Sequence, residues 1–151
     1  MSQPAIRPGS FTIERRYDAV PERVFAAFAQ SEARRKWLVF ADGWTIHGCR
    51  PAEPTMAGAV EFSRFSPFGA DVVLTNATTW LHVEDNRTFI DVYHMTLGGA
   101  ALSSSLVTIT FRSDGTGTCL TLTEQSAYFD GDISGREEGT RALLGEVEKV
   151  L

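Results

Sequence analysis

The stretch SGREEGTRALLGEVEKVL (134–151) carries the clearest structural pattern in the chain. Ser134, followed three residues later by Glu137, forms a capping box, which marks the start of a helix. Glu137 and Arg141 have the spacing of an ion pair on a helix surface. An apolar stripe at helical spacing follows, formed by Thr140, Leu144, Val147 and Leu151. The stretch predicts a C-terminal amphipathic helix that buries one face.

Two glycines fall inside this predicted helix. Gly139 and Gly145 should each cost about 1 kcal/mol relative to alanine. Either the helix backbone approaches the sheet closely at these positions, or the fold tolerates the cost. The sequence does not distinguish these explanations.

Upstream of the helix, short β-rich runs alternate with turn signals. Strands are predicted over 44–50, from 60 onward, and over 71–83, 88–97, 106–111 and 118–123. Turns are predicted at 57–58, 67–69, 98–99 and 113–117. Repeated turns at this spacing indicate an antiparallel meander.

The N-terminal region predicts one strand and two short helices. Residues 11–17 alternate with period two, as a strand does. A helix then begins with Pro21 in its first turn, where a missing N–H costs nothing. Its apolar face consists of Val24, Phe25 and Phe28. Ser31 is a favourable N-cap for a second helix that runs through residue 38. We interpret the basic cluster 34–36 as the solvated face of that helix.

This order of elements predicts an α+β domain in which an antiparallel sheet carries the major helix across one face. Residues 1–9 are expected to form a flexible leader, and residues 10–151 a single domain of ordinary size. Layer packing alone does not show whether the space between helix and sheet is hollow.

Composition excludes several classes of function. The net charge of −5 opposes binding to nucleic acid or anionic lipid. The longest apolar run, residues 24–29, is far too short to span a membrane, and the first residues lack the apolar stretch of a secretory signal. Cys49 and Cys119 are expected to be free thiols in a reducing compartment. We therefore expect a cytoplasmic protein without a nucleic-acid partner or a membrane span.

Several segments resemble the helix-grip (START-like, SRPBCC) superfamily. FTIER (11–15), VPERVFAAF (20–28) and RKW (35–37) resemble bacterial members related to the C-terminal domain of the heat-shock-protein-90 ATPase activator. LTLTEQ (120–125), FDG (129–131) and REEGTRALL (136–144) are similar to a branch often labelled polyketide cyclase. The resemblance implies a curved antiparallel sheet that wraps around the C-terminal helix, with a cavity for a small apolar ligand between them. The resemblance implies no catalytic residues in this chain, because the superfamily has no shared catalytic residue set.

The β-rich runs on either side of residues 84–87 predict a hairpin. With the turn centred on residues 85–86, the facing pairs are Glu84–Arg87, His82–Phe89, Trp80–Asp91 and Thr78–Tyr93. One face then mixes large aromatic side chains with isolated polar groups, as the wall of a small-molecule pocket does. That face consists of Leu74, Asn76, Thr78, Trp80, His82, Phe89, Asp91, Tyr93, Met95 and Leu97. We expect it to point inward, although a one-residue slip in register would reverse the assignment.

The candidate cavity-lining residues are Trp37, Trp44, Phe62, Asn76, Trp80, Asp91, Tyr93, Met95, Phe129 and Leu144. Core packing is the alternative role of the two tryptophans at 37 and 44, and a hydrophobic latch is the alternative for Phe129. Asp91 and Tyr93 would form an acid–base pair if they were buried together, because burial raises the pKa of a carboxyl group. A buried hydrogen bond explains the two residues equally well.

The sequence contains none of the recognisable catalytic, nucleotide-binding or zinc motifs, and we expect no metal site and no cofactor. His47, His82 and His94 are expected to be structural or on the surface. The leading hypothesis is a carrier or sensor that binds a small apolar or aromatic molecule. The alternatives are a cavity enzyme with cyclase- or hydrolase-like acid–base chemistry and a chaperone-associated protein-interaction module. A homodimer is compatible with all three.

Overall fold

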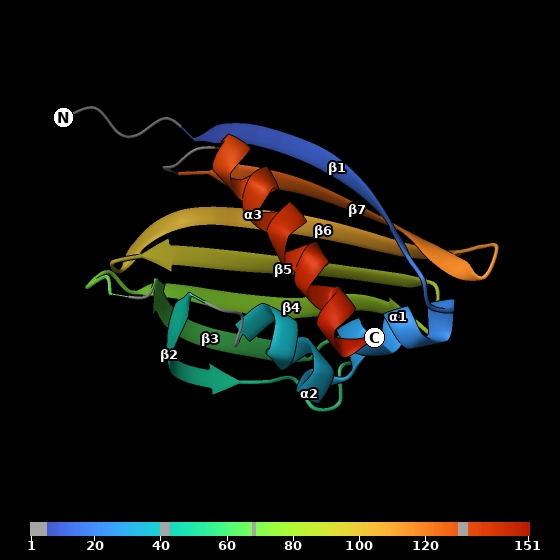
Figure 1. The fold of residues 1–151 in the computed structure, drawn as a ribbon. Coiled ribbons are helices and arrows are strands. Elements are labelled where there is room, and N and C mark those ends of the chain that lie inside the picture. The colour runs from blue at the N-terminus through green and yellow to red at the C-terminus, as the bar shows by residue number, and fades with distance from the viewer. Residues whose placement is uncertain (1–5, 40–42, 68, 130–132) are drawn as a thin grey trace.

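The computed structural model of the protein describes residues 6–39, 43–67, 69–129 and 133–151. These residues form a seven-stranded antiparallel sheet with the strand order β1-β7-β6-β5-β4-β3-β2. The strands are β1 (Arg7–Tyr17), β2 (Trp44–Arg50), β3 (Val60–Pro67), β4 (Leu74–Glu84), β5 (Thr88–Leu97), β6 (Ala100–Asp114) and β7 (Gly117–Tyr128). The helical segments are α1 (Pro21–Ala29), α2 (Ser31–Arg34), the π-helical η1 (Arg35–Val39), α3 (Ile133–Glu146) and the 3-10 helix η2 (Val147–Val150). Figure 1 shows α3 crossing one face of the sheet.

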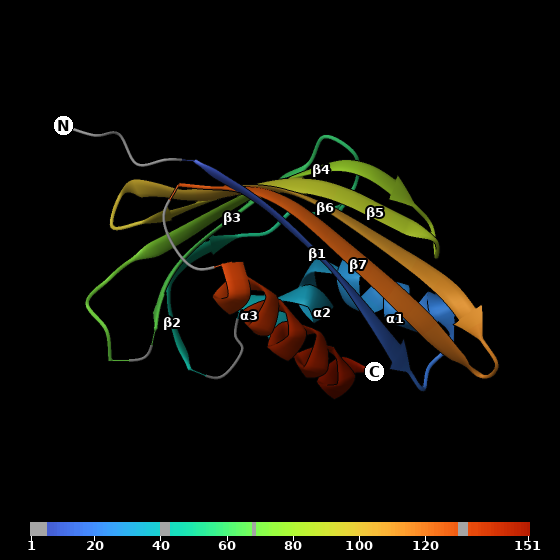
Figure 2. The same cartoon turned by 90° about the horizontal axis from the view of Figure 1, so that it is seen from above.

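The sheet is curved, and its helices lie on the concave side. Figure 2 shows the strands arching over α3, with α1 and α2 on the same side as α3. From β2 to β7 each strand pairs with the next one along the chain, which confirms the predicted antiparallel meander. β1 instead pairs with β7, so the first and last strands lie side by side. The predicted α+β helix-grip architecture is confirmed.

β1 buries one face and begins earlier than expected. Phe11, Ile13 and Tyr17 are buried, as the period-two pattern predicts. The strand starts at Arg7, inside the predicted leader 1–9, because β7 continues to Tyr128 and supplies pairing partners there. Residues 1–5 of that leader lie outside the described residues.

α1 packs an aromatic cluster against one part of the sheet. Its predicted apolar face is confirmed, since Val24, Phe25 and Phe28 are buried. Phe25 stacks on Phe89 of β5 with ring centroids 4.6 Å apart, and Phe111 of β6 meets it edge-on at 5.4 Å. Side chains therefore fill the space between α1 and the sheet.

The second helix begins at Ser31 and continues from α2 into η1. The prediction that Ser31 is the N-cap of this helix is wrong. The N-cap is Gln30, whose extended backbone precedes the first helical residue. The Ser31 hydroxyl donates instead to the carboxylate of Glu53. In η1, the indole N–H of Trp37 donates to the Ala27 carbonyl at 2.8 Å and ties this segment to α1.

The C-terminal helix is confirmed, with its last turn in 3-10 form. Leu144 and Val147 are buried, and the Tyr17 hydroxyl of β1 donates to the Leu144 carbonyl at 2.7 Å. The predicted Glu137–Arg141 ion pair is present at 3.4 Å. α3 begins at Ile133, so Ser134 already lies inside the helix and is not its N-cap as the predicted capping box requires. No helix in the described ranges is long and apolar enough to cross a membrane.

Close approach of the backbone does not explain the two helix glycines. A Cβ atom on Gly139 would meet no atom within 4 Å. A Cβ atom on Gly145 would lie 3.7 Å from the Arg15 guanidinium, which is ordinary van der Waals contact. The fold therefore tolerates the conformational cost of both residues.

Candidate functional site

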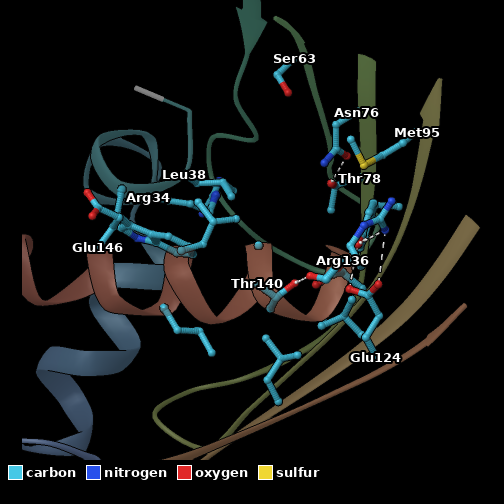
Figure 3. Close-up of a pocket in the computed structure, with 18 of the residues that line it drawn as sticks. Arg34, Leu38, Ser63, Asn76, Thr78, Met95, Glu124, Arg136, Thr140 and Glu146 are labelled. Atoms are coloured by element: carbon cyan, nitrogen blue, oxygen red, sulfur yellow. Dashed lines mark hydrogen bonds and ion pairs between the residues drawn. The ribbon is translucent and has the colours of Figure 1, made fainter. Parts of the chain in front are cut away.

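A cavity of about 510 Å³ lies between the concave face of the sheet and α3, with η1 at one side. This volume is in the range of small-molecule pockets, roughly 300–1,000 Å³. Successive side chains of a strand point to opposite faces, so alternate residues of β3, β4 and β5 reach the cavity. From these strands the lining residues are Glu61, Ser63, Phe65, Leu74, Asn76, Thr78, Trp80, Asp91, Tyr93 and Met95. Figure 3 shows this wall facing Arg136, Thr140 and Glu146 of α3.

All but two of the candidate residues line the cavity: Trp37, Trp44, Asn76, Trp80, Asp91, Tyr93, Met95 and Leu144. The two tryptophans at 37 and 44 occupy different environments. Trp37 is buried and also belongs to the core, whereas Trp44 is 40% exposed and meets Phe65 edge-on at 5.1 Å. Trp37 therefore has both roles that the sequence left open, and Trp44 lies where the cavity approaches solvent.

Phe62 and Phe129 are not among the described residues that line the cavity, which corrects both expectations. Glu61 and Ser63 take the inward positions of β3, so strand alternation places Phe62 on the opposite face. Phe129 follows the end of β7, and its ring meets the exposed His94 edge-on with centroids 6.4 Å apart.

The inward orientation predicted for the β4–β5 hairpin is confirmed in its middle. The facing pairs Trp80–Asp91 and Thr78–Tyr93 are as predicted, and all four residues line the cavity. Nearer the turn the register differs, because Val83 rather than His82 faces Phe89. The predicted place of His82 on the inward face is therefore wrong.

A β-bulge causes this difference. The register of β4 shifts between Trp80 and His82, which adds a residue to the strand and leaves the His82 side chain 54% exposed. The turn contains Asn86 in the left-handed conformation (φ 63°), and Glu84 faces Thr88 instead of Arg87. Arg87 still contacts Glu84 across the turn through a backbone hydrogen bond of 3.0 Å and an ion pair of 3.1 Å.

A buried ion pair between Arg34 and Glu61 closes one side of the cavity, and sequence reasoning missed it. Arg34 is only 1% exposed, so the predicted solvated face is wrong at this position. Its Nη2 and Nε atoms donate to the two Glu61 carboxylate oxygens at 2.6 and 3.1 Å. Nη1 donates to the Phe28 carbonyl at 2.6 Å and to the Thr55 hydroxyl at 3.0 Å. The guanidinium also lies over the Trp80 ring, 5.0 Å from its centroid.

A second polar cluster is centred on the Glu124 carboxylate of β7, which is 2% exposed. Oε1 accepts a hydrogen bond from the Tyr93 hydroxyl at 2.7 Å, and Oε2 accepts from Ser126 at 3.0 Å and from Arg136 at 3.3 Å. Arg136 of α3 also donates to the Tyr93 hydroxyl at 2.7 Å and to Ser103 at 2.8 Å. Figure 3 shows Arg136 beside Glu124, whereas Arg34 lies at another part of the cavity wall. Tyr93 is therefore paired with Glu124 and Arg136, and no hydrogen bond between described side chains joins it to Asp91.

Asp91 lies on the central strand between these two clusters. It faces Trp80 on one side and Val107 on the other, and Val107 faces Glu124. The Asp91 side chain is 6% exposed and accepts no hydrogen bond from any described residue. Burial raises the pKa of this carboxyl to about 7; the negative charge of Glu124 adds to the increase, while Arg34 opposes it. Asp91 therefore changes its charge near neutral pH inside the cavity.

A curved antiparallel sheet that encloses a cavity with its C-terminal helix defines the helix-grip class of proteins. The sequence matches the family described as "Activator of Hsp90 ATPase homolog 1-like protein" over residues 18–151, and the chain belongs to this family. The resemblance drawn from the sequence is thereby confirmed.

Solved structures of bacterial proteins share the whole fold. The Mll3558 protein from Rhizobium loti is 37% identical, with a TM-score of 0.84 over 97% of this chain and 99% of that protein. An uncharacterized protein from Rhizobium leguminosarum is 26% identical, with a TM-score of 0.86 over 97% of this chain and 95% of that one. Protein CV1439 from Chromobacterium violaceum, at 18% identity, supports the fold alone, with a TM-score of 0.76 over 93% and 96% of the two chains. No curated protein matches the sequence significantly.

Proposed function

We propose that the protein binds one small apolar or aromatic molecule in the cavity between the sheet and α3, as a carrier or sensor. The observation that carries this proposal is a cavity of about 510 Å³ with a mainly apolar wall and a few convergent polar groups. We propose a cytoplasmic location for this activity, and the two free cysteines support it because free thiols persist in a reducing compartment.

The wall has the composition that a small-molecule site needs. Its apolar part includes Trp37, Leu38, Phe65, Leu74 and Met95. Its isolated polar groups include Ser63, Asn76 and Thr78, which Figure 3 shows along the sheet side. The Thr78 hydroxyl donates to the Asn76 side-chain oxygen at 3.1 Å, so the Asn76 amide nitrogen is oriented and has no partner among the described residues. Apolar contact would supply affinity, and such polar groups would select one orientation of the ligand.

The first test is native mass spectrometry of the protein purified from its own host, followed by identification of any bound small molecule. A stoichiometric apolar adduct supports the proposal. A protein that carries no adduct and shows no thermal shift across an aromatic and lipid library contradicts it.

A substitution that fills the cavity provides the second test. We expect Thr140→Trp to lower the affinity for the neutral fluorophore N-phenylnaphthylamine at least about tenfold, because the indole would occupy ligand space. Glu138→Trp, on an exposed position of the same helix, is the matched control and should bind normally. Equal affinities of the two variants, each with an intact circular dichroism spectrum, would exclude the cavity as the binding site.

Asp91 favours a second candidate function, a cavity enzyme that uses acid–base chemistry. A buried carboxyl with a pKa of about 7 in a cavity has the properties of a general acid or base at neutral pH. The test is to incubate the ligand found by mass spectrometry with the wild type and with Asp91→Asn. A product that forms only with the wild type identifies an enzyme, whereas an unchanged ligand with both proteins supports the carrier.

A further inference from the structure

The charged groups of the cavity wall differ in how completely they are satisfied. Arg34 directs all three of its nitrogen atoms to protein acceptors, two of them to Glu61. The Arg136 charge is compensated by Glu124, and its donors also reach Tyr93 and Ser103. Each arginine is thus paired with a carboxylate within the wall, so neither presents an uncompensated positive charge to a ligand.

The carboxylates of the wall differ in whether a basic side chain compensates their charge. Glu146, at the C-terminal end of α3, is half-buried and pairs with the exposed Lys149. Asp91 is different. It is only 6% exposed, and it has neither a salt bridge nor a hydrogen bond with any described residue. A buried carboxyl group without a partner is costly, and such groups are normally paired in a functional state. Because Asp91 lines the cavity, its carboxyl group is available to a polar group of a bound molecule.

We propose that the cavity selects apolar molecules that carry a protonatable nitrogen, such as an amine or a basic heterocycle, and that the Asp91 carboxylate is the group that recognises this nitrogen. The inference rests on the proposed small-molecule function and adds the charge class of the ligand. A cationic nitrogen beside the buried Asp91 carboxylate would form a charge-assisted hydrogen bond. A ligand carboxylate would instead approach the Asp91 carboxylate, whose charge no described residue compensates by a salt bridge, and like charges at short range are strongly unfavourable.

Three ligands of nearly equal shape test the proposal: naphthylmethylamine, naphthylmethanol and naphthoate, with the same ring attachment. Their affinities are measured slightly above neutral pH by displacement of N-phenylnaphthylamine. We expect the amine to bind roughly tenfold or more tightly than naphthoate, with the alcohol between them. Asp91→Asn should remove most of the preference for the amine, and Asp71→Asn, at an exposed position outside the cavity, should keep it.

The pH dependence provides a readout that a loss of packing would not reproduce. Binding of the ammonium group requires ionised Asp91, so wild-type affinity for the amine should fall roughly tenfold as the pH is lowered from about 8 to about 5.5. In Asp91→Asn this dependence should be much weaker. The other titratable or charged groups that face the cavity are Arg34, Glu61, Tyr93, Glu124, Arg136 and Glu146. They are the same in both proteins, so the difference between the two pH profiles isolates Asp91.

The possible results separate this inference from the function on which it rests. If all three ligands bind with similar affinity, or if Asp91→Asn keeps the preference for the amine, the charge selectivity is wrong and the cavity function stands. If N-phenylnaphthylamine and all three ligands fail to bind, the proposed function fails and the charge selectivity fails with it.

Discussion

At the scale of single residues, Asp91 links stability to pH, because its carboxyl is buried and has a pKa of about 7. An unfolded aspartate has a pKa near 3.9, so between these values the folded protein holds the proton more tightly than the unfolded chain. The contribution of Asp91 to stability is therefore full below about pH 4 and is lost as the pH rises to about 7. The expected loss is about 4 kcal/mol in the free energy of unfolding.

Asp91→Asn should therefore become more stable relative to the wild type as the pH rises from about 4 to about 8. Urea denaturation at several pH values measures this difference directly. Asp71→Asn is the control, since its exposed side chain should give a nearly constant difference. A pH-independent effect of Asp91→Asn would show that the carboxyl does not have a raised pKa.

The Arg34–Glu61 pair gives a second prediction at this scale. Arg34→Met leaves the Glu61 charge buried and unpaired, so we expect a loss of about 3–5 kcal/mol in the free energy of unfolding. Arg34→Met combined with Glu61→Met should recover most of this loss, because apolar residues of similar volume can replace a buried pair. A double-mutant cycle in urea measures the coupling. Additive effects of the two substitutions would contradict the expected coupling.

Sequence reasoning failed at Arg34 for a physical reason. A run of basic residues in a short helix is usually solvated, and the partner that buries this arginine lies on strand β3, 27 residues away in sequence. The sequence prediction placed Phe62 on the inward face of that strand, so Glu61 was expected to point away from Arg34 and the pair was not recognised. Asp91 was found because its neighbours on the hairpin face are large and aromatic, whereas the partner of Tyr93, Glu124 of β7, was not found.

At the scale of elements, α3 contains a glycine that can be replaced without a steric penalty. Gly139→Ala should raise the free energy of unfolding by up to about 1 kcal/mol, because the new Cβ enters open space and alanine favours the helix. Gly117→Ala in β7 is the contrasting variant, since its Cβ would lie 2.5 Å from the Tyr17 carbonyl oxygen and should destabilise the protein. Thermal unfolding compares the two. A loss of stability in Gly139→Ala would show that the glycine has a role beyond helix propensity.

The elements themselves were predictable because their signals are local. Period-two runs separated by glycine turns define the meander, and the apolar stripe from Thr140 onward defines α3. The bulge after Trp80 was not predictable, because the extra residue in β4 depends on pairing with β5 and leaves no mark in composition or spacing. The inward and outward faces could therefore be assigned in the middle of the hairpin, and the assignment failed beyond the bulge.

At the scale of the whole molecule, the sequence predicts the layers and leaves the space between them undetermined. α1 fills its part of the concave face with aromatic rings, whereas α3 covers a cavity of about 510 Å³. Both helices present apolar residues to the same sheet, so amphipathic pattern alone cannot distinguish a filled interface from a hollow one. The expectation of a cavity came from the family resemblance, and the residues that line it became clear only from the strand register.

The pairing of β1 with β7 has a consequence for the order of folding during synthesis. β1 is made first, but its partner spans residues 117–128, and the Tyr17 hydroxyl reaches a carbonyl of α3. The ribosome must therefore produce nearly the whole described chain before the first strand can take its place in the sheet. The cavity closes only after α3 has formed. Any site that needs both the sheet and α3 is therefore complete only late in synthesis.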